Sequence, residues 1–236
     1  MSIRENIAAI REKMDAAAIA AGRDPKKILL CAATKMNDAN AVREAIRCGV
    51  DCCGENRVQE LTAKLADNAY QGAPVHFIGH LQTNKVKQVV GKVDLIQSVD
   101  SLRLLEAIQK EAARQNITQN ILLEINIGQE ENKSGFTTQE VWEILDKIQN
   151  FPNIGVKGLM AIPPVCQNPG DNDKFFQEMY NLAVDITAKK GDNVSMEILS
   201  MGMSDDYADA IRCGSTMIRV GTAIFGARNY LSVHQQ

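Results

Sequence analysis

The sequence lacks both an excess of positive charge and any long apolar run. Its 26 Lys and Arg are outnumbered by 29 Asp and Glu, which gives a formal net charge of -3 and leaves no broad basic surface for a phosphate backbone. We therefore expect no nucleic-acid partner. The longest apolar stretches, such as residues 28–33 and 121–123, are far shorter than the roughly 20 residues that cross a bilayer, so we expect no membrane span.

The N-terminus lacks the uninterrupted apolar core of a secretory signal, because Arg4, Glu5, Arg11 and Glu12 lie among its apolar residues. This pattern is typical of an amphipathic helix. We therefore expect the protein to remain in the cytoplasm.

The sequence also lacks any CxxC pair among its six cysteines. Most of them lie within apolar runs, where a reduced cysteine packs as a small core residue. Cys52 and Cys53 are adjacent, and neighbouring residues of a strand point to opposite faces, so these two thiols cannot easily share one ion. We therefore expect a reducing compartment and no metal site. The cysteines are Cys31, Cys48, Cys52, Cys53, Cys166 and Cys213.

What the sequence does contain is an eightfold alternation of short apolar runs and amphipathic stretches, without a proline-rich linker. Strand, helix, strand repeated in this way gives either a closed parallel barrel or an open doubly wound sheet. The open sheet normally carries GxGxxG after its first strand, and residues 33–37 read ATKMN instead. We therefore predict a single (β/α)₈ TIM barrel domain over residues 1–236, with the barrel at about 28–230. The expected strands are residues 28–34, 52–54, 75–78, 95–98, 121–127, 155–162, 196–199 and 216–220.

An extra helix precedes the barrel in this prediction. Ser2 and Glu5 have the spacing of a capping box, and Gly22 ends the periodic pattern, so the leading helix is expected at about residues 2–22. Polar residues that begin later helices are Asp38, Thr83, Ser101 and Thr138.

The loops after the seventh and eighth strands have the residues of an anion site. Barrels often bind phosphate at these two loops, through backbone amides and hydroxyl groups. Ser200, Gly202 and Ser204 follow the seventh strand, and Gly221 and Thr222 follow the eighth. Either loop alone could be an ordinary turn, but two on adjacent strands favour a phosphate site.

Two charged residues fall at informative strand positions. Lys35 directly follows the first expected strand, at the barrel mouth. A desolvated neutral amine there can attack an aldehyde and form a Schiff base. The alternative is an ordinary solvated lysine at the end of a strand. Arg219 shares one side of the eighth strand with Met217 and Gly221. Its alternatives are a salt bridge at the barrel rim and a contact to a planar ligand.

Three further residues carry weaker signals. Asn56 and His80 follow the second and third strands, where either could be an ordinary turn residue. Lys133, in the loop after the fifth strand, could equally be a solvated lysine.

Seven short strings of the sequence, taken together, resemble the pyridoxal phosphate homeostasis protein family. The strings are TK at 34–35, GENRVQE at 54–60, HFIGHLQ at 76–82, KSG at 133–135, GLM at 158–160, LSMGMS at 199–204 and RVGTAIFG at 219–226. The resemblance runs from about Ile28 to Tyr230. The chain departs from it at Met36-Asn37, where members often have a proline, and at Val75, where they often have a tryptophan.

The resemblance implies a barrel like the N-terminal domain of alanine racemase that binds pyridoxal 5′-phosphate (PLP) as a Schiff base on Lys35. It implies phosphate contacts from Ser200, Gly221 and Thr222, and it places Asn56 and Met203 near the ring and Arg219 at the pyridine nitrogen. We count His80, Gly202 and Ser204 among the cofactor-binding candidates as well. The resemblance further implies a role in PLP homeostasis, with PLP delivered to transient apoenzyme partners.

We expect a monomeric PLP carrier rather than an enzyme with established turnover. A permanently charged Arg219 at the pyridine nitrogen weakens the electron sink that PLP catalysis needs. The chain also ends soon after the last barrel motif, without the second domain that carries a racemase's acid/base tyrosine. A single-domain amino-acid racemase and a cofactor-free Schiff-base aldolase remain the alternatives.

Overall fold

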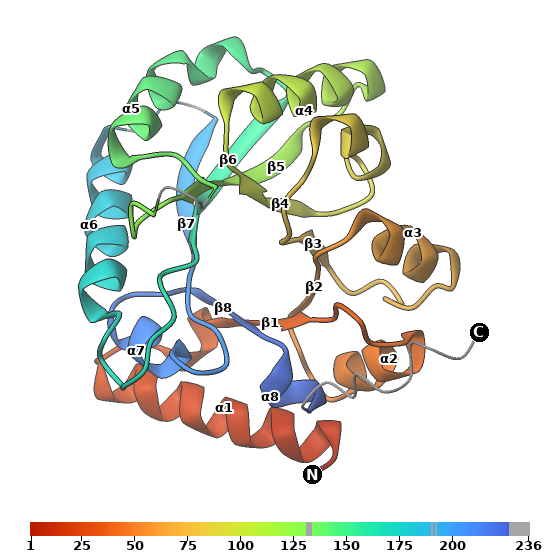
Figure 1. The fold of residues 1–236 in the computed structure, drawn as a ribbon, viewed down its shortest axis with the longest axis vertical. Helices are drawn as coiled ribbons and strands as arrows, with labels where there is room; N and C mark the ends of the chain where they lie inside the picture. The colour runs from red at the N-terminus through yellow and green to blue at the C-terminus, as the bar shows by residue number, and fades with distance from the viewer. Residues whose placement is uncertain (131–133, 190, 192, 227–236) are drawn as a thin grey trace.

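The fold is a closed barrel of eight parallel strands surrounded by helices (Figure 1). The computed structural model describes residues 1–130, 134–189, 191 and 193–226. Strand β1 pairs with β2 on one side and with β8 on the other, so no sheet edge is left open. The strands are β1 (Leu29–Ala33), β2 (Cys52–Glu55), β3 (Val75–Phe77), β4 (Leu95–Val99), β5 (Gln119–Ile125), β6 (Ile154–Ala161), β7 (Val194–Ser200) and β8 (Met217–Val220).

An α-helix follows every strand except β3, which is followed by the 3-10 helix η2 (Thr83–Gln88). The α-helices are α1 (Ile3–Ala20), α2 (Ala39–Arg47), α3 (Val58–Ala66), α4 (Leu102–Gln115), α5 (Thr138–Lys147), α6 (Asp173–Lys189), α7 (Tyr207–Arg212) and α8 (Thr222–Phe225). Short 3-10 helices are η1 (Pro25–Lys27), η2 (Thr83–Gln88) and η3 (Ile148–Asn150). No helix in the described parts of the chain is long and apolar enough to span a membrane.

The leading helix is confirmed. Glu5 N donates to Ser2 Oγ at 3.3 Å and Ser2 N donates to Glu5 Oε2 at 2.7 Å, which completes the predicted capping box. Figure 1 shows α1 lying across α7 and α8. Asn6 Nδ2 donates to Ile224 O at 2.8 Å, so the first helix is held to the last turn of the described chain.

Two of the other predicted helix starts are confirmed and two are wrong. Asp38 and Ser101 each accept the expected cap bond, from Ala41 N at 2.8 Å and from Leu104 N at 3.4 Å. Thr138 is not a cap, because Thr137 forms a reciprocal capping box with Glu140 one residue earlier. The segment at Thr83 is a six-residue 3-10 helix without a side-chain cap, so the β3–β4 connection contains no α-helix.

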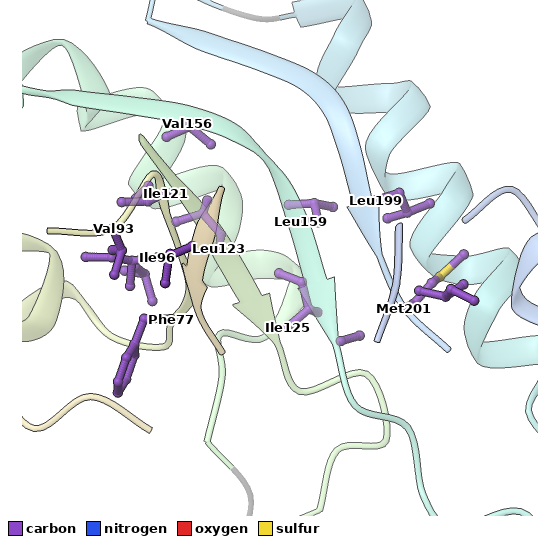
Figure 2. Packing of buried hydrophobic residues seen from close by; sticks show 14 of the residues in the cluster. Phe77, Val93, Ile96, Ile121, Leu123, Ile125, Val156, Leu159, Leu199 and Met201 are labelled. Carbon is purple, nitrogen blue, oxygen red and sulfur yellow. The ribbon is translucent and has the colours of Figure 1, made fainter. Parts of the chain in front are cut away.

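The main core lies between the barrel and the helices. It combines strand residues such as Leu30 and Ala32 with residues from most of the helices. Figure 2 shows Phe77, Ile121 and Leu159 in this layer. Smaller clusters, made by alternate strand residues, fill the barrel interior; one contains Cys31, Cys52 and Met217, and the other contains Leu95, Leu122 and Met160.

Candidate functional site at the barrel mouth

The predicted site residues all lie at or just beyond the carboxyl ends of their strands. Lys35 follows β1, Asn56 follows β2, His80 follows β3, and Ser200 ends β7. Gly221 and Thr222 follow β8, and Gly202, Met203 and Ser204 follow β7. Because the strands are parallel, these positions share one end of the barrel. Lys133 lies outside the described residues.

Lys35 sits half-buried in a turn that neighbouring elements hold rigidly. Met36 adopts a left-handed backbone with φ 62°, and its N–H donates to Glu60 Oε2 at 2.6 Å. Asn37 Nδ2 donates to the Lys35 carbonyl oxygen at 3.0 Å. The backbone that carries the lysine is therefore fixed from both sides.

Beneath this turn lies a buried polar network that sequence reasoning missed. Lys64 Nζ is 2.6 Å from Glu55 Oε1 and donates to the Thr34 carbonyl oxygen at 2.7 Å. Thr34 Oγ1 and Tyr70 Oη both donate to Glu55 Oε1 as well. Burial, followed by the charge of Glu55, raises the pKa of Tyr70 well above its usual value. The network joins the ends of β1 and β2 to α3. Its carboxylate, Glu55, is part of the GEN string in the family resemblance, but the sequence did not indicate its partners.

Arg219 is buried inside the barrel, on the same side of β8 as Met217. Arg219 Nη1 donates to Ser200 Oγ at 2.6 Å and Nη2 donates to the Ala161 carbonyl oxygen at 2.9 Å. Burial lowers the pKa of Arg219, and nearby Cys31 and Glu124 oppose that shift. The bonding partners are thus a hydroxyl and a carbonyl oxygen, in place of the carboxylate that a rim salt bridge would use.

Ser200 continues this chain of hydrogen bonds toward the middle of the barrel. Its hydroxyl donates to Gln97 Oε1 at 2.7 Å, and Gln97 Nε2 lies 2.9 Å from His76 Nδ1. Ser200 is fully buried. A chain of hydrogen-bonded side chains from β8, β7, β4 and β3 therefore crosses the interior, and no sequence motif pointed to Gln97 or His76 as members of it.

The two loops predicted to bind phosphate lie next to each other. Ala223 N donates to Ser204 Oγ at 3.5 Å, which joins the loop after β7 to the start of α8. Gly202 has φ 93°, and a Cβ there would lie 2.6 Å from the Ala210 Cβ, so only glycine fits. Met203 is 38% exposed between these loops.

A pocket of about 310 Å³ opens at the carboxyl ends of β2, β3, β5 and β6. Of the predicted residues it includes Asn56 and His80. Asn56 Oδ1 is buried without a hydrogen-bond partner, whereas the His80 ring is 62% exposed and its Nδ1 lies 3.1 Å from Asp100 Oδ2. The pocket is lined by Asn56, Ile78, Gly79, His80, Glu124, Ile125, Asn126, Ser134 and Ile162.

Glu124 is a second titratable residue that lines this pocket, and sequence reasoning missed it. Burial raises its pKa to about 7, and the negative charge of Asp100 acts in the same direction. Arg219 and His80 oppose the shift. A carboxyl group directly after the apolar residues Ile121 to Leu123 of β5 was the available signal.

Comparison with known proteins assigns the chain to a family. The family model for the N-terminal domain of alanine racemase matches residues 2–229. A pyridoxal phosphate homeostasis protein of Aquifex aeolicus is 40% identical over 230 residues, which cover 98% of this chain and 100% of that protein. The chain belongs to the pyridoxal phosphate homeostasis protein family. The member from Escherichia coli K12 is 38% identical, with 97% of each chain covered.

Solved structures agree with this assignment of family and fold. PipY of Synechococcus elongatus, 30% identical, matches with a TM-score of 0.84 in its structure without PLP and 0.82 in its structure with PLP bound. Each match covers 95% of this chain and 100% of PipY. Alanine racemase of Clostridium difficile is 15% identical with a TM-score of 0.74, and 57% of that chain is covered; it shares the fold. The predicted barrel and family are therefore confirmed.

Proposed function

We propose that the protein binds PLP through a Schiff base on Lys35 and serves in PLP homeostasis by holding and delivering the cofactor. The observation that carries this proposal is the pairing of β1 with β8, in which Cys31 pairs with Arg219 and Ala32 with Val220. The residues that follow these strands, Lys35 and the phosphate loop at Gly221, therefore leave the barrel side by side. PipY, a 30% identical relative, has been solved with PLP bound.

The mouth has the features that a PLP site needs. Asn56 Oδ1 is a buried acceptor without a partner, and a polar group of a ligand can supply the missing donor. A Cβ at Gly221 would come within 3.3 Å of both the Cβ and the carbonyl oxygen of Ala33, so this loop approaches β1 as closely as glycine allows. The lysine turn and this loop are therefore near enough for one ligand to contact both.

Each candidate residue then has a role in holding the cofactor. When bound, PLP supplies the aldehyde that condenses with the Lys35 amine. Ser200, Ser204 and Thr222, with the backbone of Gly202 and Gly221, would hold the phosphate, because hydroxyl and amide donors suit an anion. The side chains assigned to the ring are Asn56, His80, Met203 and Arg219.

Arg219 supports a carrier in preference to a PLP enzyme. Its guanidinium stays positive among a hydroxyl and a carbonyl oxygen, and a fixed positive charge disfavours protonation of a nearby pyridine nitrogen. An unprotonated ring withdraws electrons weakly, so proton abstraction from an amino acid would be slow. The members from Aquifex aeolicus and Escherichia coli carry names that describe homeostasis. We place the protein in the cytoplasm, where apoenzymes would receive the cofactor.

The attachment is tested by borohydride reduction in the presence of PLP, followed by peptide mapping. We expect one labelled peptide containing Lys35, and we expect Lys35→Arg to lose both the label and the visible absorption band. Lys27→Ala is the matched control, because Lys27 precedes the same strand at the opposite end of the barrel and is exposed. A label on Lys64, or equal labelling of Lys35→Arg and the control, overturns the attachment.

The role is tested separately with PLP-loaded protein. A carrier should exchange the α-hydrogen of alanine with deuterated water no faster than free PLP does, and it should load an apoenzyme faster than PLP dissociates spontaneously. Exchange well above free PLP would establish the racemase alternative. A colourless protein that cleaves sugar phosphates would establish the aldolase.

A further inference from the structure

Three metal-ligating side chains meet inside the barrel, below the mouth. Cys31 in β1, Cys52 in β2 and His76 in β3 have ligand atoms that all lie within 4.8 Å of one another. The three side chains are buried, with exposed fractions of 0%, 2% and 6%. They come from three consecutive strands, so the barrel wall itself holds them in place.

The strand register and one glycine bring the three side chains together. Cys31 and Cys52 are direct partners between β1 and β2. His76 is the direct partner of Gly54, two residues beyond Cys52 on the same face of β2. A Cβ at Gly54 would lie 2.9 Å from the Cys31 Sγ, so any larger residue there would displace the thiol. The glycine leaves the space across which the sulfur atoms and the imidazole face one another.

The surroundings suit a soft cation. Met217 packs against both cysteines, and Leu29 and Ile198 border the same cluster. Thiolate and imidazole ligands beside a thioether select Cu(I) or Zn(II) over Mg²⁺ or Ca²⁺, which need oxygen ligands.

The imidazole is already oriented by a neighbour. Gln97 Nε2 donates to His76 Nδ1 at 2.9 Å, so the neutral ring carries its proton on Nε2 in this state, and a metal binds Nε2 once that proton has moved to Nδ1. Metal-bound histidines typically bond their second nitrogen to such a neighbour, which fixes the ring.

We infer that Cys31, Cys52 and His76 form a binding site for one thiophilic d¹⁰ cation, Zn(II) or Cu(I). Bonds of about 2.0 to 2.3 Å to a shared ion place its ligand atoms roughly 3.5 to 4 Å apart, so a small inward movement of the side chains closes the site. On binding, any thiol proton still present is released to solvent and the imidazole remains neutral. Two thiolates balance Zn(II), and the extra negative charge left with Cu(I) is offset by Arg219.

The chain of hydrogen bonds through Gln97 connects this site to Ser200. A metal on Nε2 leaves the proton on Nδ1, so His76 becomes a donor and the Gln97 amide must turn its oxygen toward it. Without metal, the Ser200 hydroxyl donates its proton to Gln97 Oε1 at 2.7 Å. After the amide has turned, its nitrogen donates to Ser200 Oγ instead, and the hydroxyl proton becomes available for an anion at the mouth. Metal and phosphate binding should therefore favour each other; this coupling rests on the proposed function.

The site is tested on the full chain with its thiols kept reduced. Zn(II) is added in equilibrium dialysis and Cu(I) in competition with bicinchoninate, and we expect one equivalent of at least one of them. Cys52→Ala should weaken that binding at least about 100-fold, whereas Cys53→Ala should leave it unchanged. Cys53 is the matched control, since it is an adjacent buried thiol that belongs to the outer core.

A spectroscopic measurement on the unaltered protein keeps the inference testable if Cys52→Ala does not fold. Co(II) in place of Zn(II) should give a thiolate-to-metal charge-transfer band, and cadmium NMR should report two sulfur ligands. The inference is overturned if neither metal binds at one equivalent, if Cys52→Ala and Cys53→Ala bind alike, or if Zn(II) binds but the cobalt complex has no charge-transfer band.

The coupling has its own readout. PLP affinity of the unaltered protein, measured first without metal, tests the proposed function alone. Loading the thiol site should then tighten PLP binding by about 5-fold or more, and Gln97→Leu should abolish that gain while retaining the metal. An equal PLP affinity with and without bound metal refutes the coupling and leaves the metal site standing.

Discussion

Replacement of Glu124 by glutamine should stabilise the protein at neutral pH and leave it unchanged in acid. Burial, aided by Asp100, raises the pKa of this carboxyl from 4.5 to about 7 against the opposing charges of Arg219 and His80. A shift of this size corresponds to about 3 kcal/mol, and partial exposure of the side chain reduces it to about 2 kcal/mol. Glutamine keeps the shape of the protonated acid and never acquires the charge.

The direction of the pH dependence follows from proton binding. Between pH 4.5 and about 7 the folded state holds a proton on Glu124 that the unfolded state has released. Stability from this group is therefore present below the unfolded pKa and is lost as the pH rises through that window. The free-energy difference between Glu124→Gln and the unaltered protein should grow from near zero at about pH 4.5 to about 2 kcal/mol above pH 7.

Urea denaturation across this pH range measures the difference. Glu178→Gln is the control, because Glu178 is exposed on α6 and the substitution removes one negative charge without touching the pocket. A difference that does not change with pH, or a Glu124→Gln variant that is less stable than the unaltered protein at pH 8, would refute the assignment of a raised pKa.

Two further substitutions test the network under the lysine turn and the corrected helix cap. Lys64→Met should cost about 3 to 5 kcal/mol in urea unfolding, because it leaves the carboxylate of Glu55 buried without its cation, and adding Glu55→Gln should recover part of the loss. Thr137→Ala should lower stability by about 1 kcal/mol through loss of the box with Glu140, whereas Thr138→Ala should change it little; the reverse order would restore Thr138 as the cap.

The parts of the fold that sequence predicted are those encoded within short stretches of chain. Strand and helix alternation, together with the absence of GxGxxG, specified the closed barrel. Capping residues Ser2, Asp38 and Ser101 were recognisable because each bonds an amide three residues away. The error at Thr138 has the same local origin, since two adjacent threonines compete and only the position of Glu140 distinguishes them.

The placement of the mouth residues was predictable for a different reason. In a parallel barrel every strand ends at the same face, so the residue after each apolar run must lie there whatever the register. Lys35, Asn56 and Gly221 needed no knowledge of pairing. The network of Glu55, Lys64 and Tyr70 could not be found in this way, because it depends on how α3 packs behind β1 and β2.

The barrel interior was beyond sequence reasoning because its contacts depend on register, which closure of the whole barrel sets. Alternation along β2 correctly separates Cys52 from Cys53, and on that ground a shared ion was argued against. The same alternation turns Cys52 toward Cys31, because these two residues are direct partners when β1 and β2 pair. Alternation thus separates Cys52 from Cys53 and brings Cys52 close to Cys31. Such contacts are found only by comparing the inward-facing residues of neighbouring strands at the same height in the barrel. At one such height His76 lies beside both Cys52 and Gln97, each more than 20 positions away in the sequence.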